Sequence, residues 1–141
     1  MIKLTDQMRN EIDTALEQGC PCLIATISED GLPNIGYKGS MMVFDDTSLA
    51  YWERTLQGTL ANIEANPNVM VLFRNPKTRA AWRFLGKATL HKEDAAREQV
   101  MARTVPAELE RDPDRKGYGV IIAVDKVLPL GGQTPMQSRD S

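Results

Sequence analysis

Residue types that bind small anionic ligands are concentrated in two short stretches of the chain, residues 37–40 and 51–55. Lys38 and Arg54 provide positive charges, and Ser40 and Thr55 provide hydroxyl groups, a combination that suits a phosphate. Gly39 has no side chain, so a ligand can approach its backbone closely. These two stretches therefore predict a binding site for a small anion.

Aromatic side chains and the start of a helix could complete this site. Tyr51 or Trp52 could flank a flat ring, and a helix that begins near Thr55 would point its first N–H groups at the anion. A structural alternative explains the same residues as a β-hairpin with a sheltered aromatic residue, an exposed Glu53–Arg54 pair and a threonine that caps the helix. Spacing alone leaves both interpretations open.

Other kinds of catalytic site have few candidates. The chain contains a single histidine and no Gly-x-Ser-x-Gly, Walker or dinucleotide-binding motif. That histidine, His91, lies at the end of a predicted strand next to Lys92 and Glu93, which is typical of a solvated junction. Cys20 and Cys22 have no second cysteine pair with which to bind zinc, and we expect them to be small buried residues in a reducing compartment. Acid–base and metal mechanisms therefore lose most of their candidates.

The balance of charges argues against a polyanionic partner. With 17 Lys+Arg and 19 Asp+Glu the net charge is -2 at pH 7, so neither nucleic acid nor an anionic membrane is expected to attract the chain. Residues 38–92 are mildly positive, with eight basic and four acidic residues, which suits a small anionic ligand better. The first residues lack a targeting pattern and no apolar run approaches the ~20 residues of a membrane span, so we expect a cytoplasmic protein.

Hydrophobic periodicity predicts the elements that position these residues. Apolar side chains recur every four residues from Leu4 to Leu16 and predict an N-terminal helix that ends at Gly19. Two further helices, a surface excursion and a loose polar tail are expected at residues 55–65, 91–103, 104–116 and 131–141. Short apolar, β-branched runs predict six or seven strands, at residues 22–27, 32–35, 41–44, 48–52, 69–73, 80–90 and 118–127.

The order of these elements indicates an antiparallel fold. Hairpins join neighbouring strands, and the repeated strand–helix alternation of a Rossmann sheet is missing. Six or seven strands of this length, with few charges on the inner face, can close a small barrel with helices on its outside. We expect one ligand-binding domain over residues 1–130, followed by the tail at residues 131–141.

Several segments, in order and spacing, carry a resemblance to a known family. They are CLIATISEDGLPNI, KGS, NIEANPNVMVLF and the strand that contains GKA. Together they resemble the pyridoxamine 5'-phosphate oxidase-like, FMN-binding split-barrel superfamily, from about Thr5 to Val127. The resemblance implies a mainly β (α+β) antiparallel Greek-key split barrel with peripheral helices. It also implies a homodimer with two FMN sites at the subunit interface.

The resemblance assigns binding roles to the two stretches described above. Residues 51–55 match the strand before the phosphate-binding helix, and residues 38–41 match those that line the flavin ring. Thr59 stands where many members have a lysine for the phosphate, a loss for which Arg54 could compensate. The oxidase's basic, substrate-binding C-terminus is not matched by LPLGGQTPMQSRD, which argues against pyridoxamine phosphate as substrate. The predicted cofactor-binding residues are Lys38, Gly39, Ser40, Met41, Tyr51, Trp52, Glu53, Arg54, Thr55 and Thr59.

These observations lead to one main hypothesis and two alternatives. The main hypothesis is a dimeric FMN-binding flavoprotein that acts as a flavin-dependent oxidoreductase or electron-transfer protein on a small-molecule redox substrate. The flavin would carry the redox chemistry, so a side-chain nucleophile is not required. The first alternative is a non-catalytic split-barrel module that binds haem or a deazaflavin. The second is a cofactor-free dimer whose predicted site residues seal the interface.

Overall fold

The protein is described by a computed structural model over residues 1–140, which contain eight strands and four helices. Within this range no helix is long and apolar enough to cross a membrane. In chain order the elements are α1 (Asp6–Asp13), β1 (Cys22–Ile27), β2 (Pro33–Lys38), β3 (Met42–Asp45), β4 (Ser48–Glu53), α2 (Gly58–Ala65), β5 (Asn68–Arg74), β6 (Ala81–His91), α3 (Ala95–Arg103), α4 (Pro106–Leu109), β7 (Tyr118–Leu128) and β8 (Gln137–Ser138).

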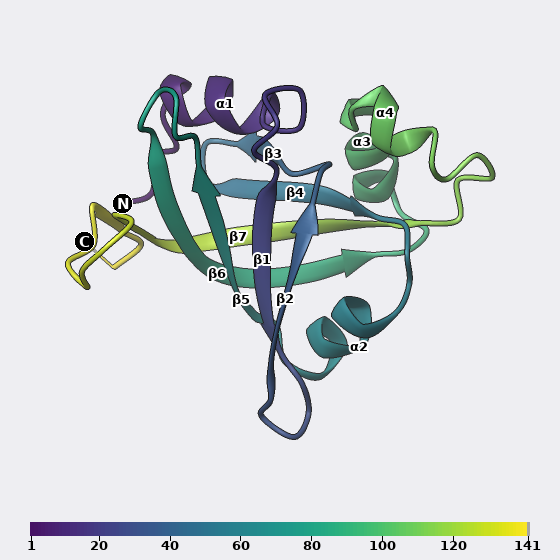
Figure 1. Cartoon of the computed structure of the whole chain (residues 1–141). Coiled ribbons are helices and arrows are strands. Elements are labelled where there is room, and N and C mark those ends of the chain that lie inside the picture. The colour runs from purple at the N-terminus through teal and green to yellow at the C-terminus, as the bar shows by residue number, and fades with distance from the viewer. Residues whose placement is uncertain (141) are drawn as a thin grey trace.

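The strands form one strongly curved sheet with the helices around its outside (Figure 1). Their order is β2-β1-β5-β6-β7-β4-β3, with β8 paired to β7 outside this path, and every pairing is antiparallel. The short link at residues 39–41 joins the two edge strands, β2 and β3. The predicted antiparallel α+β fold is thus confirmed, and the strand beyond the predicted seven is the two-residue β8.

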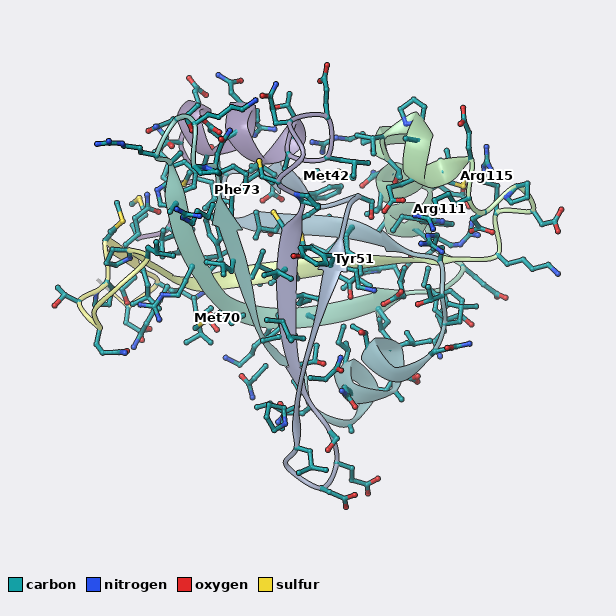
Figure 2. All side chains as sticks on the ribbon, viewed as in Figure 1. Met42, Tyr51, Met70, Phe73, Arg111 and Arg115 are labelled. Carbon is teal, nitrogen blue, oxygen red and sulfur yellow. The ribbon has the colours of Figure 1, made fainter. Side chains whose placement is uncertain are left out.

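Alternation along the strands separates a barrel interior from an outer face. On β1 and β5 the inward residues, such as Cys22 and Val71, are fully buried, whereas the residues between them are partly exposed. Tyr51 and Phe73 belong to this interior cluster and lie within the curved sheet in Figure 2. The Phe73 ring stacks on Trp82 of β6, with 5.7 Å between ring centroids.

A smaller layer of buried side chains lies between β4 and α3. Trp52 points outward from β4 into this layer, where the Arg97 guanidinium lies 4.9 Å from its ring centroid. Its indole Nε1 donates a hydrogen bond to Asp112 Oδ2 at 2.9 Å. Gly117 makes this approach possible, because a Cβ there would lie 2.7 Å from the indole nitrogen. Residues 104–116 are therefore more than the surface excursion predicted, because they contain α4 and a buried carboxylate.

Asp112 holds this layer together through three donors. Besides the indole, the backbone N–H groups of Lys116 and Gly117 donate to its carboxylate at 3.0 and 2.9 Å. Burial alone would raise the pKa of Asp112, but these hydrogen bonds favour the charged form and lower its pKa below the ordinary value. The carboxylate is therefore ionised when it makes these contacts.

Helix α3 begins later than predicted because of its cap. Asp94 accepts a hydrogen bond from the Arg97 N–H at 2.9 Å, so the helix starts at Ala95 rather than at residue 91. His91 stays at the end of β6, where its Nδ1 lies 2.8 Å from Asp94 Oδ2. The hydrogen bond with His91 is the main cause that lowers the pKa of Asp94.

The C-terminal tail is paired rather than loose. Strand β8 pairs with the end of β7, and Gln137 exchanges two 2.8 Å hydrogen bonds with the backbone of Lys3. Arg139 Nε donates to Asp125 Oδ1 at 3.0 Å. We call Lys3, Asp125, Gln137 and Arg139 the terminal clasp; it holds the first and last described residues side by side in Figure 1.

We expect Asp112→Ala to lower the free energy of unfolding by about 2 kcal/mol, because it leaves three donors, two of them buried, without their acceptor. The exposed Asp114, two residues away, provides the matched control, and Asp114→Ala should change stability by less than about 0.5 kcal/mol. Urea unfolding of the three proteins at pH 7 measures both effects. As the pH falls through the lowered pKa of Asp112, the wild type loses the stability that the charged carboxylate contributes. The difference in free energy of unfolding between the wild type and Asp112→Ala should therefore become smaller in acid.

Candidate functional site

A buried ion pair forms the centre of the candidate site. Lys38 lies at the end of β2 and Glu53 at the end of β4, and we call the end of the barrel where these two strand ends meet its mouth. Lys38 Nζ lies 3.1 and 3.0 Å from the two oxygens of the Glu53 carboxylate. The two side chains are only 12% and 1% exposed. The predicted exposed Glu53–Arg54 pair is therefore wrong, because Glu53 is buried and its partner is Lys38.

Two neighbouring hydroxyl groups surround this pair. Thr55 Oγ1 donates to Glu53 Oε2 at 3.0 Å. The Tyr51 hydroxyl is buried and has no hydrogen-bond partner among residues 1–140, while its ring lies 5.4 Å from Lys38 Nζ. Burial, together with the nearby Glu53 carboxylate, raises the pKa of Tyr51 well above its ordinary value. The phenol therefore stays protonated.

Ser40 fixes the link between the edge strands onto β4. Its hydroxyl donates to the carbonyl of Trp52 at 3.2 Å and accepts from the Trp52 N–H at 3.0 Å. These bonds occupy both roles of the hydroxyl and place residues 38–40 against residues 52–53. The side chain of Ser40 thus has a structural role in bringing the two predicted stretches together.

The loop before α2 differs from the sequence prediction. The helix begins at Gly58 rather than near Thr55, and its N-cap Gln57 makes no side-chain capping bond. Leu56 has a positive φ of 49°, which turns the chain between Thr55 and the helix. Thr55 binds Glu53 rather than capping the helix. The first N–H groups of α2 are therefore without a side-chain partner from the N-cap.

Two predicted phosphate ligands flank this helix start. The Arg54 guanidinium makes no hydrogen bond or ion pair with any other residue in the range 1–140 and is partly exposed. Thr59 lies in the first turn of α2 and is also partly exposed. One unpaired guanidinium beside an uncapped helix start is an arrangement that can hold an anion.

A small cavity of about 50 Å³ lies among these residues. Six of the predicted cofactor-binding residues line it, together with Tyr37, which belongs to the first predicted stretch but not to that set, and Glu108, which the sequence analysis did not select. The lining residues are Tyr37, Lys38, Ser40, Trp52, Glu53, Arg54, Thr55 and Glu108. Gly39 lies beside the cavity, whereas Met41 and Tyr51 are buried in the barrel interior.

Glu108 reaches the site from α4 because Gly39 has no side chain. A Cβ at position 39 would lie 2.5 Å from Glu108 Oε1. The Glu108 carboxylate is 14% exposed and lies 3.8 Å from the Arg111 guanidinium. The cavity is therefore lined by two cations and two carboxylates. No local sequence pattern indicates Glu108, since α4 approaches the site only through the folding of residues 104–116.

Other candidates give no second site in the described chain. Cys20 and Cys22 are both free, with Cys22 fully buried. Burial raises the pKa of the Cys22 thiol, so it stays protonated and inert. Between residues 1 and 140 there is no cluster of three His, Cys, Asp or Glu side chains that could hold a metal ion.

The sequence pattern that defines the family described as "Pyridoxamine 5'-phosphate oxidase" matches residues 8–125. The chain belongs to this family. The match covers β1 to β6 and most of β7, and it includes both stretches of the candidate site. No protein of curated function gives a significant match.

Solved structures support the pyridoxamine 5'-phosphate oxidase family assignment. HupZ from Group A Streptococcus is 28% identical over 94% of this chain and 98% of its own, with a TM-score of 0.76. A candidate pyridoxamine 5'-phosphate oxidase from Lactobacillus delbrueckii is 28% identical over 89% of this chain and 93% of its own, with a TM-score of 0.70. An FMN-binding protein from Syntrophomonas wolfei, 11% identical over 91% of this chain and 89% of its own, shares the fold with a TM-score of 0.69.

We expect Lys38 and Glu53 to be strongly coupled in stability. Lys38→Met or Glu53→Leu alone leaves a buried charge unpaired and should lower the free energy of unfolding by about 3–5 kcal/mol. The double variant should lose less than either single variant, which urea unfolding of all four proteins measures. In the exposed Lys92–Glu64 pair, Lys92→Met should cost less than about 1 kcal/mol. Additive losses in the double variant would show that the buried pair is not coupled.

Proposed function

We propose that this chain is an FMN-binding flavoprotein and acts as a flavin-dependent oxidoreductase or electron-transfer protein. The observation that carries the proposal is the unpaired Arg54 guanidinium beside the uncapped start of α2, at the mouth of the barrel. Family membership adds support, since the fold is shared with a protein described as FMN-binding. The proposed partner in this reaction is a small-molecule redox substrate.

The donors at this mouth fit a phosphate group. Arg54 supplies a charge-assisted hydrogen bond, the first N–H groups of α2 supply the positive end of a helix dipole, and Thr59 supplies a hydroxyl. Thr55 lies in the same loop, but its hydroxyl already donates a hydrogen bond to Glu53. Lys38 is neutralised by Glu53, so it adds little net charge. Arg54 is therefore proposed as the main electrostatic contact of the phosphate.

The size of the cavity indicates that the flavin ring lies outside it. Ligand pockets of this class are about 300–1,000 Å³, far more than the 50 Å³ enclosed here. The ring is therefore proposed to lie along residues 38–41, where Gly39 permits close approach. A second copy of the chain would then cover the ring, which agrees with the proposed homodimer with flavin at the interface.

Bound flavin would supply hydride or electron transfer, and this chain's residues would hold and shield it. The Lys38–Glu53 pair, fixed by Thr55, gives the ring-binding stretch a rigid and electrically neutral support. The ring of the protonated Tyr51 lies 5.4 Å from Lys38 Nζ and packs against the pair from the barrel interior. A cytoplasmic location is proposed from the two free cysteines.

Two observations favour a second candidate function. Thr59 replaces a charged phosphate ligand, and two carboxylates line the cavity, so affinity for a dianionic phosphate should be reduced. A non-catalytic module that binds a deazaflavin or haem is therefore the alternative. Purified protein with a Soret band and no retained flavin would support that alternative.

We expect the protein to retain FMN after desalting, with absorption in the flavin bands. Arg54→Ala should weaken FMN binding by about 1–3 kcal/mol, because it removes the one unpaired cation at the site. Thr59→Lys should strengthen binding by about 1 kcal/mol or more, because it restores a charge at the first turn of α2. Titration of FMN fluorescence measures both changes.

Arg79→Ala serves as the control for these variants. Arg79 is an exposed arginine in the loop between β5 and β6, away from α2 in Figure 1, and its removal should leave FMN affinity unchanged. Equal affinity of Arg54→Ala and wild type would remove Arg54 from the phosphate site. A wild type that retains no FMN at all would contradict the proposed function.

We expect the protein to be a homodimer in solution. Leu32 and Ile35, at the β1–β2 hairpin, are 65% and 64% exposed, an apolar surface on an edge strand that a second copy would cover. Ile35→Lys should shift the protein toward the monomer in light scattering, whereas Leu130→Lys, which also replaces an exposed apolar residue but lies near the tail, should not. A monomeric wild type would contradict the dimer.

A further inference from the structure

The outer face of β1, β2 and β5 is apolar and is left uncovered by residues 1–140. Two rows of side chains cross these strands in register. They are Tyr37, Leu23 and Leu72 in the first row and Ile35, Ala25 and Met70 in the second. Opposed residues share a face of a sheet, and all six are half-buried or exposed. A contiguous apolar surface of this kind marks an interaction site.

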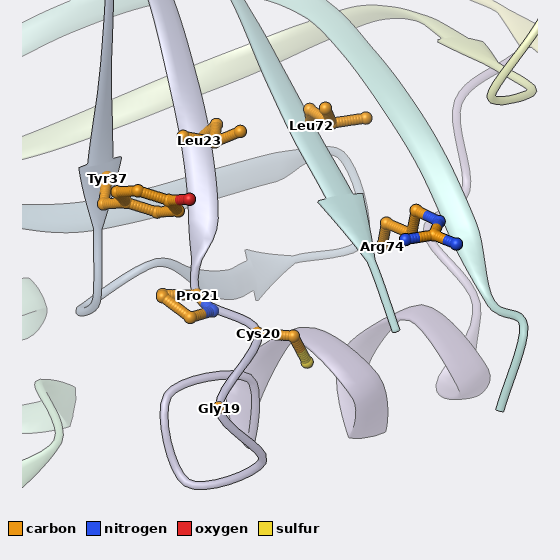
Figure 3. Close-up of a pocket in the computed structure, with 7 residues that line it drawn as sticks. All are labelled: Gly19, Cys20, Pro21, Leu23, Tyr37, Leu72 and Arg74. Atoms are coloured by element: carbon orange, nitrogen blue, oxygen red, sulfur yellow. The ribbon is translucent and has the colours of Figure 1, made fainter. Parts of the chain in front are cut away.

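A pocket of about 500 Å³ lies at one end of this face (Figure 3). The first row lines it, together with Cys20 and Arg74 among others. The lining is largely apolar apart from the Tyr37 hydroxyl and the Arg74 guanidinium. The pocket therefore fits an apolar side chain that is accompanied by a negative charge.

The charges around this pocket are mostly positive. The Arg74 guanidinium makes no hydrogen bond or ion pair with any residue between 1 and 140. Lys77 and Arg79 follow in the loop after β5, and both are exposed. One carboxylate offsets them, that of Glu11, which lies beside Cys20 as Lys77 does. Three basic residues against one acidic residue leave this end of the face positive.

The charges on the neighbouring β6 are already engaged within the subunit. Arg83 donates to two backbone carbonyls of the segment after β7. Lys87 forms an ion pair with Asp125 at 2.9 Å. The positive charge that is available to a partner is therefore the charge near Arg74.

The hairpin tip, residues 28–32 between β1 and β2, has the opposite character. It lies at the other end of the same face, far from the end of β5 in Figure 1. Glu29 and Asp30 are exposed, and neither carboxylate makes a hydrogen bond or ion pair with a described residue. Leu32 beside them is 65% exposed. The tip thus presents an apolar side chain accompanied by negative charge, which is the combination that the pocket fits.

We propose that two copies of the chain pack through this face so that the hairpin tip of each copy enters the pocket of the other. Leu32 packs on the first row, and the two acidic residues of the tip meet Arg74 and Lys77. The two-fold axis lies between the two faces and runs across the strands, because an axis along the strands would place acid against acid. The second row lies between the tip and the pocket, so it meets its own copy at the axis.

This inference rests on the proposed homodimer and specifies its geometry. Tyr37 lines the candidate cavity as well as the pocket, so the hairpin tip of the second copy lies beside the candidate site. The tip is then the element that covers the proposed flavin ring, and the site is incomplete in a monomer.

Exchanging the charges of the two ends tests this geometry. Glu29→Arg and Arg74→Glu each place like charges together at both contacts of the dimer, and each should weaken dimerisation about fivefold or more in sedimentation velocity over a dilution series. An equimolar mixture of the two variants should recover dimers, because every contact of the mixed dimer pairs opposite charges. This recovery also shows that both variants are folded. Lys116→Glu makes the same charge change at an exposed lysine outside the face and should leave dimerisation unchanged.

A cross-link tests which element enters the pocket. Leu32→Cys introduces a thiol at the hairpin tip, and a short bismaleimide should join it to Cys20 of the second copy. Cys22 is fully buried and does not compete for the reagent. The covalent dimer should be lost when Cys20→Ser is added, and it should not form in the control Asp114→Cys.

Several results would overturn the proposal. They are unchanged dimerisation of both charge variants, no recovery in their mixture, an equal loss in Lys116→Glu, and no cross-link in Leu32→Cys. A cross-link that survives Cys20→Ser would join the two tips to each other, which contradicts the axis across the strands. A dimeric wild type with any of these results contradicts this geometry alone, whereas a monomeric wild type also contradicts the proposed homodimer.

Discussion

The buried ion pair between Lys38 and Glu53 is the constraint on which the candidate site depends. A buried charge at the barrel mouth is costly unless a partner compensates it, so each of these two charges offsets the desolvation cost of the other. The pair joins the end of β2 to the end of β4, which are not neighbours in the sheet. With the Ser40 bonds to Trp52, it closes the barrel where backbone pairing stops.

The same pair also sets the electrostatics of the mouth. Lys38 would be the obvious cation for an anionic ligand, but its charge is already balanced inside the protein. The groups that remain available to an anion are the Arg54 guanidinium and the first N–H groups of α2. A neutral support with donors at its rim favours a ligand that binds to this subunit by its edge, which leaves the flat face of the ligand for the proposed second copy to cover.

Most of the fold could be predicted from the sequence because its strands have clear alternation and its turns have typical residues. The strand from residue 22 to 27 and the long strand ending near Leu90 were both placed correctly. The start of α2 could not be predicted, since the side chain that would have capped the helix, Thr55, binds Glu53 instead. Glu53 is in turn paired with Lys38, which lies on another strand.

The site was predicted less completely than the fold for the same reason. Lys38, Ser40 and Arg54 were selected because their types and spacing suit a phosphate, and the structure brings them to one cavity. Glu108 was missed because nothing in its local sequence distinguishes it from the other acids of residues 104–116. Asp112 was missed likewise, although it anchors the ring of Trp52.

The terminal clasp has a mechanical consequence. Gln137 is hydrogen-bonded to the backbone of Lys3, and β8 pairs with β7. The first and last described residues are therefore attached to the barrel at one place. A force applied between the two ends would load these few bonds first, one after another, before it reached β1 or the mouth of the barrel. A load applied across the two ends would therefore act on the terminal clasp before it reached the candidate site.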